Sequence, residues 1–547
     1  MRNRERTGDL SVHAVSGTYV VLLGMSVAED AVAGLLGFAI ERTDHTEGEH
    51  TVLENPLLFE VNDTKDPDRS TALNPVQEFV WGDYAAKPGH TYSYRVTAMG
   101  GTPSRLTPGA STEVRITTED PDDGDHGVYF NRGVAASGAY VRRFGDVNPA
   151  TVPNHAAYKW LGRGLEEAIK AFIGRAVDGR FALRAAMYEF SWGPVLDAFK
   201  VAAAAGADVQ IIYHAVPSSS DKTGATNLAA IEDAGIANLC TKRTHTKIAH
   251  NKFIVLLEKG RPVEVWTGST NITEGGIFGH ANAGHRIADE RVAKAYLGYW
   301  TELQPDPERP ALRVALDPHP KFPAGLPRRG SKTTVFSPRS ELAATDWYVR
   351  LANKAKGAVF LTAAFGLTPE IAPVFEGERS YLRYLLLDLR NGKIEAMRRD
   401  PSNVVAAGGV KGTGGFRKWI ADQLQRLNVN VDYVHTKFML VDPLSEQPIV
   451  ITGSANWSDE SVKLNDENMV VIRGDQRVAD IYLTEFMRLF NHYRLRGRAR
   501  TPRGQVSAGP SDTAQAGRRL HLTPDDSWAK PFYVPDSPEA KERLLFA

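Results

Sequence analysis

Short runs in which apolar and polar residues alternate fill the first part of the chain. Polar turns separate these runs, the clearest of which are GTYVVLL, GFAIERT, TYSYRVTAM and STEVRITT. Such alternation is typical of a strand with one buried face, and several short strands at close spacing favour a β-sandwich. The pattern therefore predicts a small β-sandwich domain over residues 1–118.

One stretch of this region, KPGHTYSYRVTAM at residues 87–99, resembles the end of a fibronectin type III repeat. The resemblance rests on a Pro-Gly turn that leads into a strand of alternating aromatic and aliphatic residues. It implies a fibronectin-like domain that could recruit a protein partner. The acidic segment at residues 119–125, EDPDDGD, has no apolar face and has the composition of a solvated linker. We expect a domain boundary there.

Beyond the acidic segment, helical periodicity alternates with apolar, strand-like runs. A helix predicted over residues 165–176 precedes FALRAAMYEF, and a helix predicted over 195–205 precedes DVQIIYHA. Helices that alternate with β-branched apolar strands favour an α/β layer architecture.

The same order returns later in the chain. It consists of TTVFSP, a helix over residues 347–356, the strands AVFLTAAF and LRYLLLDL, and a helix over 416–427. Repetition of a whole supersecondary pattern indicates internal duplication. We therefore expect two pseudo-symmetric α/β lobes, at residues 126–320 and 321–500.

Two stretches carry no such periodicity. Residues 391–415, rich in glycine, alanine and charge, predict a long loop that covers a site, with plain disorder as the alternative. Residues 501–517 are rich in Ser, Pro and Gly and predict a mobile connector. The end of the chain, through WAKPFYVP and LLF, has enough apolar surface to dock on the core. Residues 501–547 are thus expected to form a connector and a docking tail.

Composition is that of a folded globular protein and excludes several kinds of site. Hydrophobic residues make up 42% and charged residues 24% of the 547. Lysine plus arginine and aspartate plus glutamate each total 65, so no global basic field draws the protein to nucleic acid or anionic lipid. The single cysteine, Cys240, excludes an intramolecular disulfide and a multi-cysteine metal site. Because no segment has the apolar length of a signal peptide or a membrane span, we expect a cytoplasmic protein.

The strongest chemical signal is a motif that occurs once in each predicted lobe. The first copy is AHNKFIVLL followed by WTGSTNIT, and the second is VHTKFMLVD followed by ITGSANWS and NDEN. In both copies Gly-Ser-x-Asn follows His-x-Lys at the same interval, because 21 residues separate His250 from Asn271 and His435 from Asn456. The repetition of both halves at one interval sets this motif apart from a chance match.

These residues resemble the signature of the phospholipase D superfamily, His-x-Lys-x4-Asp followed by Gly-Ser-x-Asn, which its bilobal members carry twice. The resemblance covers about residues 126–500. It implies a phospholipase D-type fold, a phosphodiesterase activity and one site built from both lobes of a catalytic monomer. The second copy is complete with Asp442, whereas Leu257 stands where the first copy would have its Asp. This departure leaves open what orients His250.

The chemistry of the residues agrees with the resemblance. Residues two apart on a strand project to the same face, so His250 points with Lys252 and His435 points with Lys437. Two imidazoles that face each other across the lobes match the in-line geometry of phosphoryl transfer. Because the lysine ammoniums and the motif asparagines can neutralise charge on the phosphate oxygens, we expect no metal and no other cofactor.

The resemblance also implies a role for each histidine. His250 attacks phosphorus to form a phosphohistidine, and His435 protonates the leaving alkoxide and later activates water. The opposite assignment stays open, because acid and base roles depend on pKa values that the sequence does not reveal.

Supporting side chains accompany each motif. Glu467 is a candidate acceptor for the far ring nitrogen of His435, and Asn282 has the same spacing from its motif asparagine, which makes it the first-lobe counterpart. Asp442 would anchor a loop or pair with a lysine. The motif serines, which are expected to hydrogen-bond within their turns, are Ser269 and Ser454.

Other residues near the motifs allow alternative interpretations. His245, His280 and His285 could form a metal cluster, but no carboxylate or cysteine falls at a ligand-like spacing among them, so lining the cleft or lying in polar loops is favoured. Trp457, directly after the second motif asparagine, is either a packing residue or a substrate contact.

Three functions fit these motifs. We favour hydrolysis or alcohol exchange at a phospholipid head group, since duplicated lobes within one chain are typical of bilobal phospholipases. A nuclease or nucleic-acid end-processing enzyme is the second, for which LRNGKIEAMRRD and GRRL offer basic residues but no aromatic interleaving for base stacking. The third, a catalytically weak binding protein, is disfavoured by the complete set of two His, two Lys and two Asn.

Overall fold

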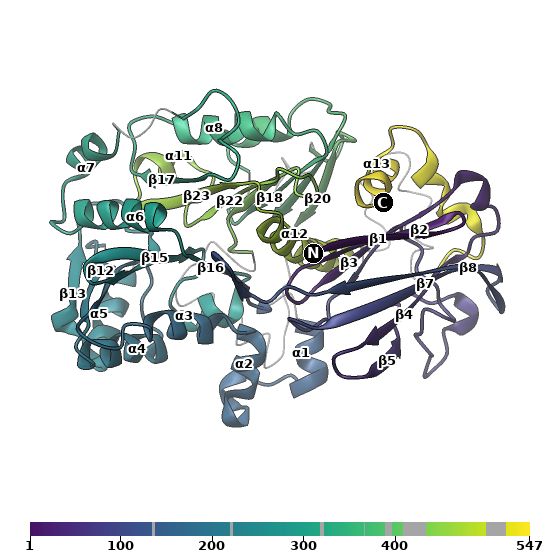
Figure 1. The fold of residues 1–547 in the computed structure, drawn as a ribbon, viewed down its shortest axis with the longest axis horizontal. Helices are drawn as coiled ribbons and strands as arrows, with labels where there is room; N and C mark the ends of the chain where they lie inside the picture. The colour runs from purple at the N-terminus through teal and green to yellow at the C-terminus, as the bar shows by residue number, and fades with distance from the viewer. Residues whose placement is uncertain are drawn as a thin grey trace.

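The computed structural model describes residues 1–133, 137–218, 222–317, 322–365, 367–388, 397–407, 434–498 and 521–547. The predicted fold class is confirmed: a β-rich N-terminal region precedes two α/β lobes, and the three lie side by side in Figure 1. No helix in the described ranges is both long enough and apolar enough to cross a membrane.

Two four-stranded antiparallel sheets form the N-terminal region, in the orders β1-β2-β3-β6 and β5-β4-β7-β8. The strands are β1 (Arg2–Thr7), β2 (Leu10–Ser16), β3 (Val21–Val27), β4 (Gly37–Asp44), β5 (Glu49–Val52), β6 (Val80–Asp83), β7 (Thr91–Thr102) and β8 (Arg105–Thr117). Their apolar positions form one core that includes Phe38, Tyr92 and Tyr94, as the alternation predicted. The resemblance to fibronectin type III stays a prediction.

The first lobe is built on an eight-stranded sheet of order β13-β12-β11-β14-β15-β16-β10-β9. Its strands are β9 (Asp122–Asp123), β10 (His126–Phe130), β11 (Phe181–Met187), β12 (Asp208–His214), β13 (Cys240–Arg243), β14 (Lys252–Glu258), β15 (Arg261–Gly268) and β16 (Ala283–Ile287). Its helices are α1 (Ser137–Phe144), α2 (Ala156–Gly162), α3 (Leu165–Ile173), α4 (Gly193–Ala204), α5 (Thr223–Ala234), α6 (Glu290–Leu303) and α7 (Arg309–Leu316). The two predicted helices of this lobe correspond to α3 and α4.

The second lobe repeats this arrangement in a seven-stranded sheet of order β17-β23-β22-β21-β18-β19-β20. Its strands are β17 (Lys332–Ser337), β18 (Ala358–Ala363), β19 (Leu382–Leu387), β20 (Asn403–Ala407), β21 (Phe438–Val441), β22 (Ile449–Gly453) and β23 (Glu467–Arg473). The helices described are α8 (Ala343–Ala352), α11 (Asp459–Lys463) and α12 (Gln476–Arg498). From β20 to β17 this sheet matches the first one from β13 to β10, strand for strand, so the predicted duplication is visible in the topology.

Some predictions for the second lobe need correction or fall outside the described ranges. The helix predicted over residues 347–356 begins and ends four residues earlier, as α8. Within the predicted loop at 391–415, the described residues contain β20, which pairs in parallel with β19. Glycines and charges on both sides of that short strand concealed it. The predicted helix at 416–427 and the connector at 501–517 lie outside the described residues.

Helix α12 lies between the N-terminal region and the two lobes (Figure 1) and joins their cores. The ring of Tyr482 on α12 contacts Phe130 of the first lobe and Phe438 of the second, each at a centroid distance of 5.1 Å. The same cluster includes Val15 and Leu22 of the sandwich. One continuous apolar core therefore holds the lobes in fixed positions relative to each other.

The acidic segment at 119–125 makes several contacts with the lobes. Its composition had predicted a solvated linker, and the structure corrects that expectation. Glu119 pairs with Arg477 of α12, and Asp122 pairs with Arg286 of β16. Residues 122–123 form β9, which extends the first-lobe sheet. Cationic partners from distant parts of the chain satisfy these carboxylates, and composition alone cannot show such partners.

The C-terminal tail docks as its apolar residues predicted. Trp528 lies in the sandwich core and donates its indole N–H to the carbonyl of Leu35 at 2.8 Å. Helix α13 (Pro538–Phe546) connects the tail to the second lobe, since Tyr384 donates to Glu542 at 3.0 Å. The tail therefore bridges the sandwich and the second lobe.

Candidate active site

The two His-x-Lys segments meet at the interface between the lobes, where β14 and β21 begin. The imidazole centroids of His250 and His435 are 6.5 Å apart, and both rings are buried. Lys252 and Lys437 are buried beside them, and each donates its ammonium to the carbonyl of the histidine two residues earlier, at 2.7 Å. The structure thus brings all four motif side chains into one place.

Backbone hydrogen bonds across the interface hold each motif against the opposite lobe. The N–H of His250 donates to the carbonyl of Asp466 at 3.0 Å, and the N–H of His435 donates to the carbonyl of Ala281 at 3.1 Å. Asp466 directly precedes Glu467, and Ala281 directly precedes Asn282. Each histidine is therefore next to a residue that follows the motif of the other lobe.

This exchange gives each imidazole a partner from the other lobe. Nδ1 of His250 lies 2.8 Å from Oε2 of Glu467, and Nδ1 of His435 lies 2.9 Å from Oδ1 of Asn282. The prediction that Glu467 holds His435 is wrong, because the lobes exchange these residues across the interface. The first copy of the motif has Leu257 in place of Asp, and Glu467 is the residue that orients His250 there.

The motif serines fix these partners. Ser269 donates to Oδ1 of Asn282 at 2.9 Å, and Ser454 donates to Oε2 of Glu467 at 2.7 Å. Both serines are buried and lie on the turns that end β15 and β22. The two halves of the site are therefore built on the same plan, with an amide in one half and a carboxylate in the other.

The glycine before each serine is required by close backbone contacts. A Cβ on Gly268, whose φ is +136°, would lie 2.3 Å from the carbonyl oxygen of Ala283. A Cβ on Gly453 would lie 2.2 Å from the carbonyl oxygen of Asn468. Only glycine lets the motif turn approach the neighbouring strand this closely.

Asp442 lies at the far end of β21 and anchors a loop. Its carboxylate accepts hydrogen bonds from the backbone N–H groups of Lys356, Gly357 and Ala358 at 2.9, 2.6 and 3.0 Å. Two roles were considered for Asp442. The structure supports the first, because the Asp442 carboxylate anchors the loop that leads into β18. Its counterpart Leu257 is buried in the apolar core of the first lobe.

The sequence reasoning missed a buried glutamate next to the first motif asparagine. Asn271 donates its amide N–H to Oε2 of Glu189 at 2.5 Å, and both side chains are buried. Asn456, in the second lobe, is partly exposed. The one carboxylate in the run FALRAAMYEF was the available signal for Glu189.

Two further polar residues were missed, one at the end of β12 and one just after β19. Nδ1 of His214 accepts the N–H of Ala249 at 3.2 Å, and Oδ1 of Asp388 accepts the N–H of Val434 at 2.7 Å. Ala249 and Val434 directly precede the motif histidines. A polar residue at the same place in DVQIIYHA and LRYLLLDL was the signal that could have identified both.

Burial dominates the electrostatics of the site. It lowers the pKa values of His250 and His435 well below the ordinary 6.5, and the neighbouring ammonium groups lower them further. Burial also lowers the pKa of Lys252 to about 8 and that of Lys437 well below its usual range. Burial raises the pKa of Glu467 to about 8 and lowers that of His250, so it disfavours the charged form of each member of this pair.

Two segments of the chain, residues 171–303 and 411–490, match a family model described as cardiolipin synthase, PLD-like domain. Each segment carries one copy of the paired motif. Both segments are therefore similar to the same phospholipase D-like family domain.

Matches to individual proteins of known name are short or distant. Over 68 residues the chain is 31% identical to the mitochondrial cardiolipin hydrolase of Canis lupus familiaris, which is 12% of this chain and 25% of that protein. Over 61 residues it is 34% identical to the human protein of that name, covering 11% and 22%. The chain thus spans about a quarter of the length of these relatives. The solved phosphatidylserine synthase of Haemophilus influenzae Rd KW20 aligns at 13% identity and a TM-score of 0.42, covering 61% of this chain and 84% of that one.

The three extra histidines of this phospholipase D-like chain lie in different surroundings. His280 borders the site, with its ring 5.9 Å from that of His435, and burial together with Lys437 lowers its pKa to about 4. His285 pairs with His126 at 2.8 Å, and the exposed His245 pairs with Asp306. No group of three His, Cys, Asp or Glu residues able to hold a metal occurs in the described ranges.

Trp457 is held by packing contacts. Its indole N–H donates to the carbonyl of Thr362 at 2.7 Å, and its ring meets Tyr348 edge-on at 5.9 Å. The side chain is 4% exposed. The structure therefore favours the packing interpretation over contact with a substrate.

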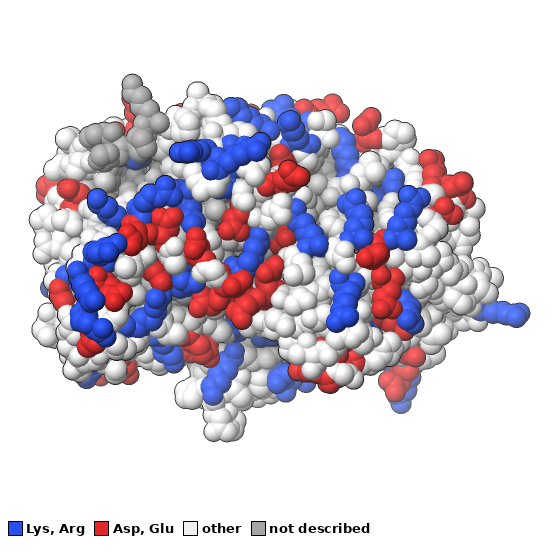
Figure 2. All heavy atoms as spheres, in the orientation of Figure 1, with Lys and Arg blue, Asp and Glu red and all other residues white. Residues whose placement is uncertain are grey.

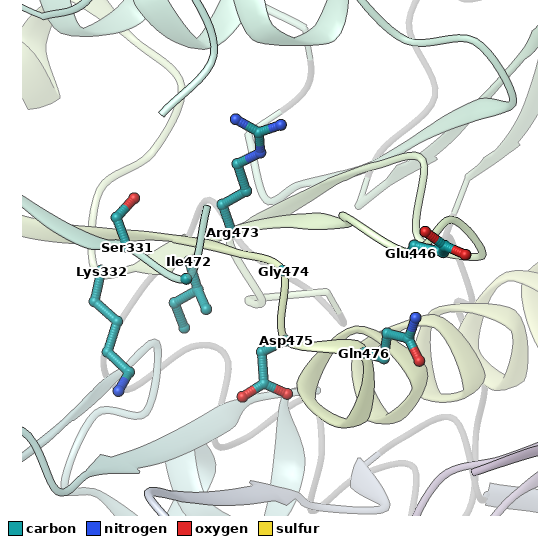
Figure 3. Close-up of a pocket in the computed structure, with 9 residues that line it drawn as sticks. Ser331, Lys332, Glu446, Ile472, Arg473, Gly474, Asp475 and Gln476 are labelled. Atoms are coloured by element: carbon teal, nitrogen blue, oxygen red, sulfur yellow. The ribbon is translucent and has the colours of Figure 1, made fainter. Parts of the chain in front are cut away.

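A surface pocket lies away from the phospholipase D motifs, where β23 ends and α12 begins (Figure 3). Its lining consists of Gly330, Ser331, Lys332, Glu446 and residues 472–476. Basic and acidic side chains are mixed there, and the ammonium of Lys332 forms ion pairs with Asp125 and Asp289, each at 3.3 Å. This pocket contains no motif residue and lacks the paired cations of the histidine site.

Proposed function

We propose that the chain is a phosphodiesterase that hydrolyses the head-group phosphodiester of a phospholipid through a phosphohistidine on His250. The observation that carries the proposal is the pair of buried imidazoles 6.5 Å apart, each held through Nδ1 by the other lobe. Two such groups on opposite sides of one phosphorus supply a nucleophile and an acid in line.

The unlike partners support the assignment of roles. Attack by Nε2 of His250 places positive charge on its ring, and the carboxylate of Glu467 at Nδ1 stabilises that charge. The amide of Asn282 fixes the ring of His435 without stabilising its cation, so protonated His435 gives up its proton readily. His250 is therefore the nucleophile and His435 the acid.

The reaction proceeds in two balanced steps. Nε2 of His250 forms a bond to phosphorus while the bond to the leaving oxygen breaks, and His435 transfers its proton to that oxygen. A water molecule then gives a proton to His435 and attacks phosphorus, which releases His250. The ammoniums of Lys252 and Lys437 stabilise charge on the non-bridging oxygens, the task that other phosphotransferases give to metal ions.

A phospholipid is the substrate we favour over a nucleic acid. The matching family model is described as cardiolipin synthase, PLD-like domain, and the matched relatives are named mitochondrial cardiolipin hydrolases. On the face drawn in Figure 2, basic side chains are interspersed with acidic ones, which gives a long nucleic-acid strand no continuous basic track on that face. Both observations support the lipid assignment.

The test is a parallel assay of the purified chain on cardiolipin vesicles, phosphatidylcholine vesicles, and single- and double-stranded DNA. We expect release of a head group from lipid vesicles and no comparable cleavage of DNA, with His250→Asn as the inactive control. Faster cleavage of either DNA would move the substrate assignment to nucleic acid. If the chain hydrolyses none of these substrates and also fails to hydrolyse a small diester, the result would support the binding-protein alternative.

Two further points belong to this proposal. Because both motifs lie in one chain, a monomer holds the complete site, and activity per molecule should stay constant on dilution. The N-terminal sandwich contributes none of the motif residues, which fits a role in recruiting a protein partner.

A further inference from the structure

Glu189 lies just beyond the end of β11, inside the site and not on its rim. Its side chain is 4% exposed, and its Oε2 accepts the amide N–H of Asn271 at 2.5 Å. The backbone is fixed as well, since the N–H of Ile272 donates to the carbonyl of Glu189 at 3.0 Å. A carboxylate only accepts hydrogen bonds, so this contact fixes which end of the Asn271 amide faces it.

The fold does not need a carboxylate at this position. Glu189 lies two residues beyond Met187, the last residue of β11 and the partner of Lys252. When the register of β18 against β21 is extended by two residues, Ala363 is opposite Lys437, so the corresponding residue of the second lobe is Phe365. Phe365 is 43% exposed. The duplicated lobes therefore differ here, and a structural requirement shared by both cannot explain Glu189.

The charge of Glu189 acts on the phosphate-binding groups. It raises the pKa values of Lys252 and Lys437, in the same direction as Glu467. The second lobe contributes Asp388, which acts on Lys437 in the same way. Burying a carboxylate costs free energy unless cations offset it, and these two ammoniums provide that attraction. In turn, Glu189 reduces the positive charge available to a bound phosphate by one unit.

Resting on the proposed phosphodiesterase function, we propose that Glu189 is a selectivity residue that admits phosphate groups with one negative charge and disfavours those with two. A phosphodiester carries a single charge. A phosphomonoester carries close to two at neutral pH, because its second pKa is about 6. Hydrolysis of a phospholipid head group leaves a monoester in the site. Glu189 thus selects the diester substrate and speeds release of the monoester product.

The test uses phenyl phosphate as a monoester inhibitor of bis-p-nitrophenyl phosphate hydrolysis, measured at pH 5.0 and pH 7.5. The variants are Glu189→Gln, which can still accept from Asn271, and Glu189→Asp, which keeps the charge. Glu264→Gln is the matched control, because Glu264 is also buried but pairs with Arg175 and Arg286 away from the motifs. Thermal unfolding of each variant checks that it is folded.

Wild-type protein, Glu189→Asp and Glu264→Gln should bind phenyl phosphate more weakly at pH 7.5 than at pH 5.0. Glu189→Gln should bind it about tenfold more tightly than wild type at pH 7.5, since one repulsive charge within a buried site is worth at least that factor. An unchanged inhibition constant in Glu189→Gln would overturn the inference. If wild type hydrolyses no diester, the proposed function fails instead, and calorimetric binding of phenyl phosphate to the same variants still decides the role of Glu189.

Discussion

Nδ1 of His250 lies 2.8 Å from Oε2 of Glu467, although the two residues are 217 positions apart and belong to different lobes. The corresponding contact of His435 is with the neutral amide of Asn282. Each lobe therefore completes the other's half of the site, and the halves differ in charge. This difference makes the two histidines chemically unequal, which the pseudo-symmetry of the lobes alone would not do.

Exchanging the charges of the two partners should separate their effects. Glu467→Gln should lower kcat by about 10²–10⁴-fold, the range typical of a lost acid–base contribution. Asn282→Asp should raise the pKa of His435 by about one to three units, as an opposite charge at hydrogen-bond distance does. The measurement is kcat/KM against pH for both variants. Equal effects of the two substitutions would contradict the assigned roles.

The pH dependence of the wild-type protein follows from the buried histidines. The proposed mechanism needs His435 protonated and His250 neutral, and burial lowers the pKa values of both below 6.5. As pH rises through the pKa of His435, the acid loses its proton, so kcat/KM should fall with a midpoint below pH 6.5. Lys252, whose pKa is about 8, should add a second decrease near that pH. A profile that stays flat from pH 6 to 9 would contradict this account.

Chelation should leave activity intact. In the proposed mechanism, the buried ammoniums of Lys252 and Lys437 and the amide of Asn271 take the place of a metal at the phosphate oxygens. Excess EDTA should therefore change the rate of diester hydrolysis by less than about twofold. Complete loss of activity that zinc restores would instead point to a metal site involving a histidine such as His280.

Much of the fold and of the site could be predicted from the sequence, because the duplication repeats both the hydrophobic pattern and the motif spacing. The motif residues His250, Lys252, His435 and Lys437 meet as the strand periodicity implied. The partner of each imidazole could not be predicted, since it depends on how the lobes pack. Glu467 illustrates this point: its spacing identified it as a supporting residue, but only the backbone contact across the interface shows which histidine it supports.

Glu189 was missed for a different reason. It lies just beyond the end of a strand whose apolar composition predicts burial, and one carboxylate at the end of such a run is not enough to indicate a site. The prediction for the acidic segment at 119–125 was wrong in the opposite sense. Its composition predicted exposure to solvent, whereas ion pairs with Arg286 and Arg477 hold it against the lobes.

The contact between the sandwich and α12 should be measurable in stability. A Cβ on Gly17 would lie 2.0 Å from Oγ1 of Thr484, so Gly17→Ala should destabilise the protein by about 1–3 kcal/mol through overpacking. Gly193→Ala is the control, because a Cβ there meets no atom within 4 Å. The measurement is the free energy of unfolding in denaturant for both variants. If Gly17→Ala is as stable as Gly193→Ala, the sandwich is not packed on α12 as described.

The central claim is that His250 is the nucleophile and His435 the acid of a two-step reaction. Bis-p-nitrophenyl phosphate has a good leaving group that needs no proton, whereas the second step still needs a base to activate water. His435→Asn should therefore accumulate a p-nitrophenylphosphoryl adduct.

The measurement is mass-spectrometric mapping of that adduct after an acid-free quench, with peptides kept at alkaline pH, where phosphohistidine persists. The account predicts the adduct on His250 in His435→Asn and no adduct in His250→Asn. An adduct on His435 of the wild-type protein, or turnover without any adduct in either protein, would contradict it.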